Sequence, residues 1–164
     1  MLMSSVLNWR EKNLTMSATY LGSGDPNTHR TDYTPEWLGR LADDVTVEAS
    51  VMNGIAQGPE AVRAILSFAR KLYDYQEFNV IGRYGDSDFV EDYVATVHGE
   101  PIGSVVVIRY NDAGLVQQIV ISHRPLRSVL LWSSIMAEHF AGTEYAKYFL
   151  QPEDLEAARE EAAR

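Results

Sequence analysis

The stretch that most constrains the fold is residues 89–125, where three apolar, β-branched runs are separated by two short turns. Runs of this composition with period-2 alternation predict β-strands. Gly99-Glu100 is placed as a two-residue hairpin loop between the first two runs, and residues 111–114 form the turn between the second and third. The stretch therefore predicts an antiparallel three-stranded meander against which the rest of the chain packs.

The two turns set the expected register. In this register Ile102 of the middle strand lies opposite Val97 of the first strand and opposite His123 of the third strand. Because neighbouring strand residues point in opposite directions, this register sorts the side chains onto two faces. One face mixes large apolar and aromatic groups with isolated polar ones, as a lined pocket does, and we predict that it is the concave, covered face. It carries Phe89, Glu91, Tyr93, Ala95, Val97, Ile102, Ser104, Val106, Ile108, Tyr110, Leu115, Gln117, Ile119, Ile121 and His123.

The segments on either side of the meander predict helices and two more strands. The clearest is an amphipathic helix that begins at Pro59, with an apolar stripe at Val62, Ile65 and Leu66. We expect helices at 4–20, 34–44, 59–73, 125–140 and 152–163, strands at 45–51 and 76–84, and a loop at 22–34. Thr34 is the expected cap of the second helix.

Length and composition indicate one globular domain without disulfides. The chain has 164 residues, no cysteine and a net charge of −9, which disfavours binding to nucleic acid and to anionic membranes. No apolar run reaches the ~20 residues that a membrane span needs, and the first residues are too polar for a secretory signal. We expect a cytoplasmic protein divided into an N-terminal extension (1–33), a central domain (34–140) and an acidic helical tail (141–164).

Four short segments, in their order and spacing, carry a resemblance to a known superfamily. They are Leu41-Ala42-Asp43-Asp44-Val45-Thr46-Val47-Glu48, Gly58-Pro59-Glu60-Ala61-Val62, the hairpin at 109–116, and His123-Arg124-Pro125-Leu126. The chain resembles the NTF2-like superfamily, in particular its SnoaL-like and ketosteroid-isomerase-like branch. The resemblance implies an α+β cone, in which a curved antiparallel sheet is wrapped by helices around a pocket.

The resemblance also implies what kinds of function to expect. The family includes isomerases, cyclases, dehydratases and epoxide hydrolases acting on small hydrophobic molecules, as well as non-catalytic members, and many are dimers. The isomerases use a carboxylate base, a tyrosine and a neutral acid. That set cannot be matched here position by position, so its residue roles are not carried over.

Glu91 is the sharpest catalytic candidate, because a carboxylate among apolar groups has a raised pKa and suits a general base. Tyr93, two residues further along the same face, could donate to a developing oxyanion. His123 could act as an acid or base at the pocket mouth, or be a strand-end histidine bonded to the backbone. Ligand contacts are expected from Gln117, Tyr110 and Ser104. If the two faces are inverted, Glu91 is instead a solvated strand residue.

Other features favour structural roles. Asp92 and Arg109 are expected to pair across the outer face, and Gly82 is expected opposite Glu91, where it would leave space. The histidines have no metal-ligand spacing, so no metal and no cofactor are expected. Two functions stay open: a cofactor-independent acid–base isomerase, cyclase or hydrolase, or a non-catalytic module that binds a hydrophobic ligand or a protein partner. A second apolar strip on 126–140, made by Leu131 and Ile135, predicts a homodimer.

Overall fold

The computed structural model describes residues 33–162, and the helix expected at 4–20 and most of the loop at 22–34 lie outside them. A curved six-stranded sheet has the order β2-β1-β6-β5-β4-β3, and it is antiparallel except where β1 runs parallel to β6. The strands are β1 (Leu41–Ala49), β2 (Ala56–Gln57), β3 (Tyr73–Tyr84), β4 (Asp88–Val97), β5 (Glu100–Tyr110) and β6 (Val116–Arg124). The predicted α+β cone is confirmed.

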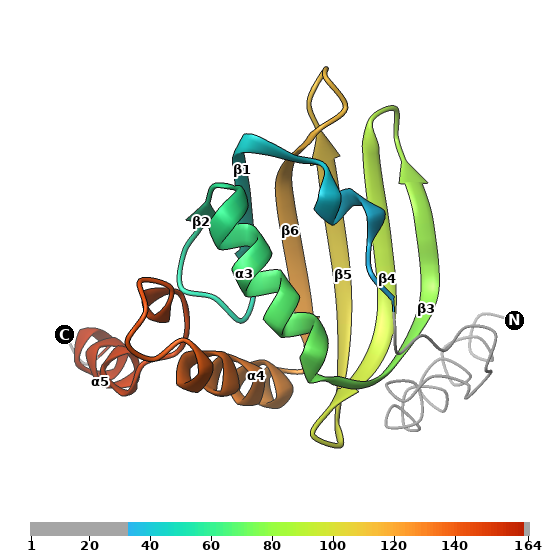
Figure 1. Ribbon diagram of the computed structural model, residues 1–164. Coiled ribbons are helices and arrows are strands. Elements are labelled where there is room, and N and C mark those ends of the chain that lie inside the picture. Colours follow the sequence, from blue (N-terminus) through green and yellow to red (C-terminus); the bar gives the residue numbers. More distant parts are fainter. Residues whose placement is uncertain (1–32, 163–164) are drawn as a thin grey trace, which may run out of the picture.

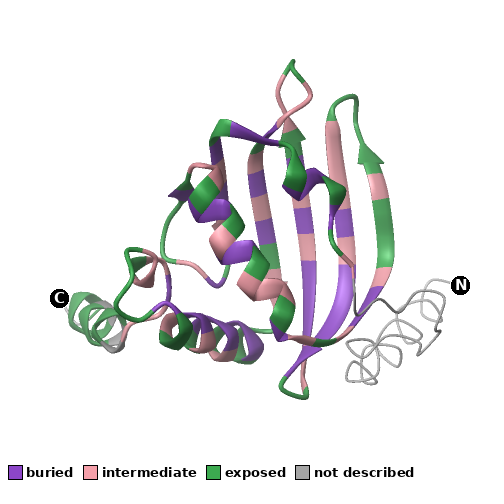
Figure 2. Cartoon of the chain, in the orientation of Figure 1, coloured by how far each residue is buried: buried purple, intermediate pink, exposed green. Residues whose placement is uncertain are grey.

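The helices cover one face of this sheet. The two main helices are α3 (Pro59–Ala69) and α4 (Leu126–His139). The one-turn helices are η1 (Glu36–Gly39) before β1, η2 (Arg70–Leu72) after α3 and η3 (Ala146–Tyr148) after α4, and the tail helix is α5 (Pro152–Ala162). Figure 1 shows α3 crossing the concave face and the η1 segment passing in front of β4 and β5. The resulting core lies between sheet and helices, and the buried bands on the middle strands are visible in Figure 2.

The predicted faces are largely confirmed, but the register of the first hairpin is wrong by two residues. The turn is His98-Gly99, one position earlier than expected, so Val97 pairs with Glu100 and Ala95 with Ile102. Both turn residues have positive φ, 50° and 77°, as a two-residue turn that follows the strand twist requires. A shift by two keeps every side chain on its predicted face, so Glu91 and Tyr93 still point inward.

The second hairpin combines the same shift with a bulge. The Asn111 side chain accepts hydrogen bonds from the backbone of Ala113 and Leu115, which makes the loop one residue longer than predicted. Tyr110 then pairs with Val116, but the neighbouring Arg109 pairs with Gln118. Because the bulged residue of β6 has no partner on β5, the β6 residues between the bulge and the turn point to the opposite face from the one predicted.

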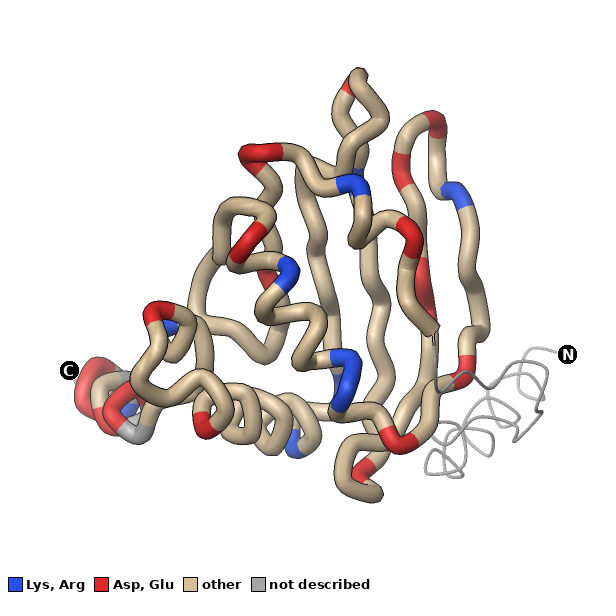
Figure 3. Tube along the Cα trace, in the orientation of Figure 1, with Lys and Arg blue, Asp and Glu red and all other residues tan. Residues whose placement is uncertain are grey.

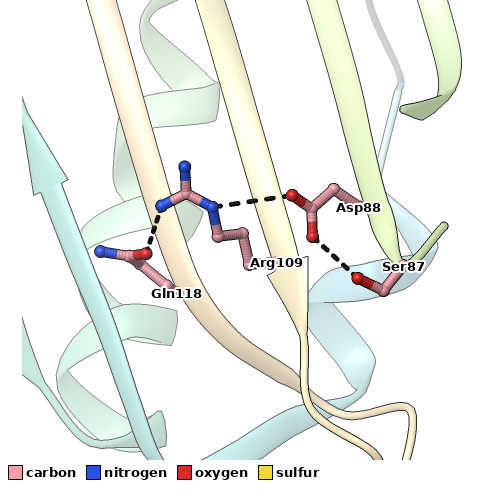
Figure 4. Close-up of polar contacts among 4 residues, drawn as sticks. All are labelled: Ser87, Asp88, Arg109 and Gln118. Carbon is pink, nitrogen blue, oxygen red and sulfur yellow. Dashed lines mark hydrogen bonds and ion pairs between the residues drawn. The ribbon is translucent and has the colours of Figure 1, made fainter. Parts of the chain in front are cut away.

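The ion pairs of the outer face differ from the prediction for the same reason. Arg109 lies 3.6 Å from Asp88 and donates to Gln118 at 2.6 Å, as Figure 4 shows. Asp92 instead pairs with Arg124 at 3.2 Å. The expected Asp92–Arg109 pair is therefore wrong, because the register shift places Arg109 opposite Asp88. Arg124 of β6 reaches Asp92 across Gly103 of the intervening strand β5.

The helix before β1 is shorter than predicted, and the strand β1 begins earlier than predicted. The helix is a single 3-10 turn that ends at Gly39, and Leu41 already belongs to β1. Thr34 does not cap this turn, because its hydroxyl accepts a hydrogen bond from Arg70. Residues 33–37, which we call the strap, therefore lie across the concave face as irregular chain at 33–35 followed by the start of this 3-10 turn.

The core extends into the segment after α4. Phe149 is fully buried and stacks on Phe140, although sequence periodicity gave it no role. Beyond it, α5 follows the expected range within one residue, and Figure 3 shows that Asp and Glu positions are frequent along it. The helix α4 buries Val129, Trp132 and Met136, as predicted. Leu131 and Ile135 of the predicted second strip are half-buried, and the exposed apolar side chains of α4 are instead Leu126 and Leu130.

Candidate functional site

A cavity lies between the concave face of the sheet and the strap, α3 and α4. Its free volume is about 60 Å³, and the cleft together with the open space at its mouth measures about 690 Å³. The lining is mostly apolar, from residues such as Leu38, Ile65, Val106 and Met136, with Phe149 from the tail segment. A few polar groups converge on it, which is the usual make-up of a small-molecule site.

Glu91 of β4 is the ionisable group at the centre of this arrangement. It is 3% exposed, and its Oε1 accepts hydrogen bonds from the Tyr33 hydroxyl at 2.6 Å and the Trp37 indole at 2.9 Å. Burial raises the pKa of Glu91, while the hydrogen bonds from Tyr33 and Trp37 lower it by a smaller amount. No residue of the described chain donates to Oε2, so that oxygen can accept a proton.

Removing one of the two donors is expected to raise the pKa of Glu91 further. Tyr33→Phe and Trp37→Phe leave an aromatic ring over the carboxylate, so burial stays while one bond to the charged form is lost. With Glu91 ionised, each change should also destabilise the fold by about 1–3 kcal/mol. Titration of the Glu91 side chain by ¹³C NMR checks the direction, and a fall in its pKa would contradict it.

Tyr93 lies on the same face and is hydrogen-bonded to Tyr73 of β3, with 2.7 Å between the two hydroxyl oxygens. Burial raises the pKa of Tyr93 to about 12, and Tyr73 is likewise raised, so both phenols stay protonated near neutral pH. Ser104 stands opposite Tyr93 and lowers the phenol's pKa, although its Oγ makes no hydrogen bond of good geometry. If Tyr73 donates to Tyr93, the Tyr93 proton is free to reach a ligand.

His123 closes the other end of the cavity. Its ring meets Trp132 edge-to-face at 4.6 Å, its Nδ1 is buried, and its backbone N–H donates to Ser50. Burial lowers the pKa of His123 to about 3, so the imidazole is neutral near pH 7 and cannot be the acid that the sequence suggested. A neutral ring can still offer a hydrogen bond.

The register shift brings His123 closer to Glu91 than the sequence predicted. Glu91, Val106 and Ile121 form one row across the sheet, and His123 lies only two residues beyond Ile121. Two strand spacings and two residues then separate the two Cα atoms by roughly 12 Å, whereas the predicted register places His123 six residues, roughly 20 Å, along the strand from the Glu91 row. Both side chains line the same cavity without contact, as expected for two ends of one site.

The remaining sequence candidates lie elsewhere. Gln117 was placed on the concave face, but the bulge turns it outward, where its amide donates to Asp44 at 3.0 Å. Tyr110 is half-buried and lines an open cleft of about 460 Å³ on the other side of the strap. Gly82 pairs with Val90, and Ile81 stands opposite Glu91, so the expected space beside the carboxylate is not made by Gly82.

Sequence reasoning missed the groups that complete the site. Tyr33, Trp37, Tyr73 and Arg70 all lie more than 15 residues from Glu91 in the sequence, and only the fold brings them to it. The one available signal was the density of aromatic residues around Thr34, which we interpreted as a helix face. Within residues 33–162 no group of three or more metal-ligating side chains comes together. No helix in that range is long and apolar enough to cross a membrane.

Comparison with solved structures identifies the fold. No protein-family model and no curated protein matches the sequence. The chain is similar to an uncharacterised protein with a cystatin-like fold from Silicibacter pomeroyi, with a TM-score of 0.60 and 21% identity over 65% of this chain and 74% of the other. A steroid delta-isomerase from Pseudomonas aeruginosa gives a TM-score of 0.59 and 17% identity over 63% and 77%.

A de novo designed protein with a curved β-sheet is similar as well, with a TM-score of 0.51 and 18% identity over 64% of this chain and 85% of that one. At such identities the likeness concerns architecture and assigns no activity. The TM-scores show that this chain shares the overall arrangement of curved sheet and helices with these neighbours. The chain therefore has the NTF2-like cone fold.

Proposed function

We propose that this protein is a cofactor-independent acid–base enzyme that moves a proton on a small, uncharged, hydrophobic carbonyl compound. The observation that carries the proposal is the Glu91 carboxyl group, buried in an apolar cavity with Oε2 unbonded by the described residues and a protonated tyrosine on the same strand. A desolvated carboxylate is a stronger base than one in water, since burial penalises its charged form.

In this mechanism Glu91 takes a proton from the carbon next to the carbonyl. The electron pair of the broken C–H bond moves onto the carbonyl oxygen, where Tyr93 donates a hydrogen bond to the developing charge. Either hydroxyl of the Tyr73–Tyr93 pair can be the donor. The mechanism uses the arrangement in which Tyr73 donates to Tyr93, which polarises the Tyr93 hydroxyl and strengthens its own donation to the ligand. Return of the proton from Glu91 to another carbon completes an isomerisation.

The lining supports an uncharged substrate. Apart from Glu91 and Arg70, whose guanidinium donates to Tyr33 and Thr34, the cavity wall is apolar or neutral, since His123 and both tyrosines carry no charge near pH 7. A carboxylate ligand would be repelled by Glu91 and would lose its hydration without a facing cation in the cavity interior. The steroid delta-isomerase neighbour agrees with this substrate class through fold analogy only.

Deuterium exchange tests the proposal directly. We expect the protein to catalyse exchange at the α-carbon of neutral ketones such as 1-tetralone and cyclohex-3-enone in D₂O, followed by ¹H NMR. Exchange should saturate with ketone and rise in proportion to protein. Saturable binding of these ketones without exchange would instead favour the non-catalytic ligand-binding module.

We further propose that the protein is a homodimer, because α4 exposes an apolar pair one turn apart. Leu126 is 72% exposed and Leu130 is 42% exposed. Burying such residues between two copies would remove apolar surface from water. Sedimentation at micromolar concentration should give the mass of two chains, and a Leu130→Glu variant should sediment as one; a monomeric wild type contradicts the proposal.

A further inference from the structure

The strap over the cavity is fastened to α3 by one side chain. Arg70, at the junction of α3 and η2, donates from Nε to the Tyr33 carbonyl oxygen at 2.9 Å and from Nη2 to the same oxygen. Nη2 also donates to the Thr34 hydroxyl at 2.8 Å. We propose that Arg70 is a positioning residue, which clamps the strap against α3 and thereby holds the Glu91 carboxyl group in its working geometry.

Tyr33 contacts both Arg70 and the Glu91 carboxylate. Arg70 holds the backbone of Tyr33, and the side chain of Tyr33 donates to Glu91 Oε1 at 2.6 Å. Four residues later Trp37 donates to the same oxygen at 2.9 Å. Glu91 therefore takes both of its hydrogen bonds from a segment that Arg70 fastens. With Oε1 occupied in this way, Oε2 is the oxygen left to face a ligand.

The strap also separates two spaces on the concave face. Tyr33 and Trp37 line the cavity that holds Glu91 on one side and the cleft of about 460 Å³ on the other. Displacing the strap would join the two and admit water to Glu91. Arg70 therefore controls both the orientation of the carboxylate and its isolation from solvent.

The groups that face Glu91 decide whether releasing the strap raises or lowers the pKa of Glu91. They are Tyr33 and Trp37 on the strap, Tyr73 on β3, Tyr93 on β4 and Tyr110 on β5, and Arg70 is the one arginine or lysine among the described residues that line the cavity. Burial raises the pKa of Glu91 by more than the strap's hydrogen bonds lower it. Releasing the strap removes both influences, so the pKa should fall toward its ordinary value.

The test is an Arg70→Met variant with two readouts that need no turnover. A role of Arg70 in catalysis rests on the proposed function of Glu91. The two readouts, Trp37 N–H exchange with solvent and titration of Glu91, test whether Arg70 holds the strap even if the cavity has no catalytic activity. We expect the Trp37 indole N–H to exchange with solvent about tenfold or more faster, because hydrogen bonds to a charged group are lost. We expect the ¹³C titration of Glu91 to move to lower pH.

Arg63→Met is the matched control, because Arg63 is exposed on the same helix and forms no hydrogen bond or ion pair within the described part of the chain. It should change neither readout. If Arg70→Met does not fold, Thr34→Val removes one acceptor of the clamp from an exposed position and should accelerate Trp37 exchange in the same direction. A folded clamp variant with wild-type Trp37 exchange and wild-type Glu91 titration would overturn the proposal.

Discussion

Replacing Glu91 by glutamine is expected to slow α-carbon exchange of bound ketones by about 100- to 10,000-fold, the range typical of a lost general base. Glutamine keeps the length of the side chain, and its carbonyl oxygen can still accept from Tyr33 and Trp37. It has no basic oxygen to take the proton. The ketone should therefore still bind, with a dissociation constant within about threefold of the wild-type value.

The controls separate a catalytic loss from damage to the fold. Glu60→Gln changes an exposed glutamate in the first turn of α3 and should leave exchange unchanged. In the wild type, the rate should fall as the pH drops through the raised pKa of Glu91, since the protonated carboxyl group cannot accept a proton. Equal loss of rate and binding in Glu91→Gln would point to a structural role, and unchanged exchange would remove Glu91 from the mechanism.

The face of the sheet on which Glu91 lies could be predicted from the sequence, because it depends only on the alternation of side chains along the strand. The alternation of β4 assigns Glu91 and Tyr93 to one face, and a register error of two residues leaves that face unchanged. Gln117 shows the limit of this reasoning. The bulge opposite Arg109 and Tyr110 leaves one residue of β6 unpaired, and this turns Gln117 to the opposite face of the sheet. The alternating sequence pattern of β6 does not indicate that a bulge is present.

The contacts of the site could not be predicted in the same way, because they join segments far apart in the chain. Tyr33 reaches Glu91 across 58 positions and Trp37 across 54. The strap looked like a helix in sequence because Thr34-Pro35 is a common helix start. Arg70, which the helical pattern assigned to the solvated side, holds the Thr34 hydroxyl in its place. A side-chain contact from another element thus overrode a local preference.

Lowering the pH from 7 to 3 is expected to destabilise the fold through His123, and the size of the effect follows from proton linkage. The pKa of His123 is about 3 in the folded chain against 6.5 for the free side chain, because the folded chain buries the ring. Between these values the unfolded chain binds a proton that the folded chain does not, so stability is lost as the pH falls through this window. The full shift corresponds to about 5 kcal/mol, and roughly 3–5 kcal/mol is expected because the residue is not wholly buried.

Glu91 acts in the opposite direction, which makes the two groups separable. Its raised pKa means that the folded chain holds a proton that the unfolded chain has released, so its contribution to stability is lost as the pH rises above the ordinary carboxyl range. The measurement is urea unfolding of wild type, His123→Phe and His123→Gln at several pH values from 3 to 7. Both variants should lose most of the acid destabilisation, since neither side chain titrates. Parallel curves for wild type and variants would show that His123 is solvated in solution, and the buried end of the cavity would then have to be open to water.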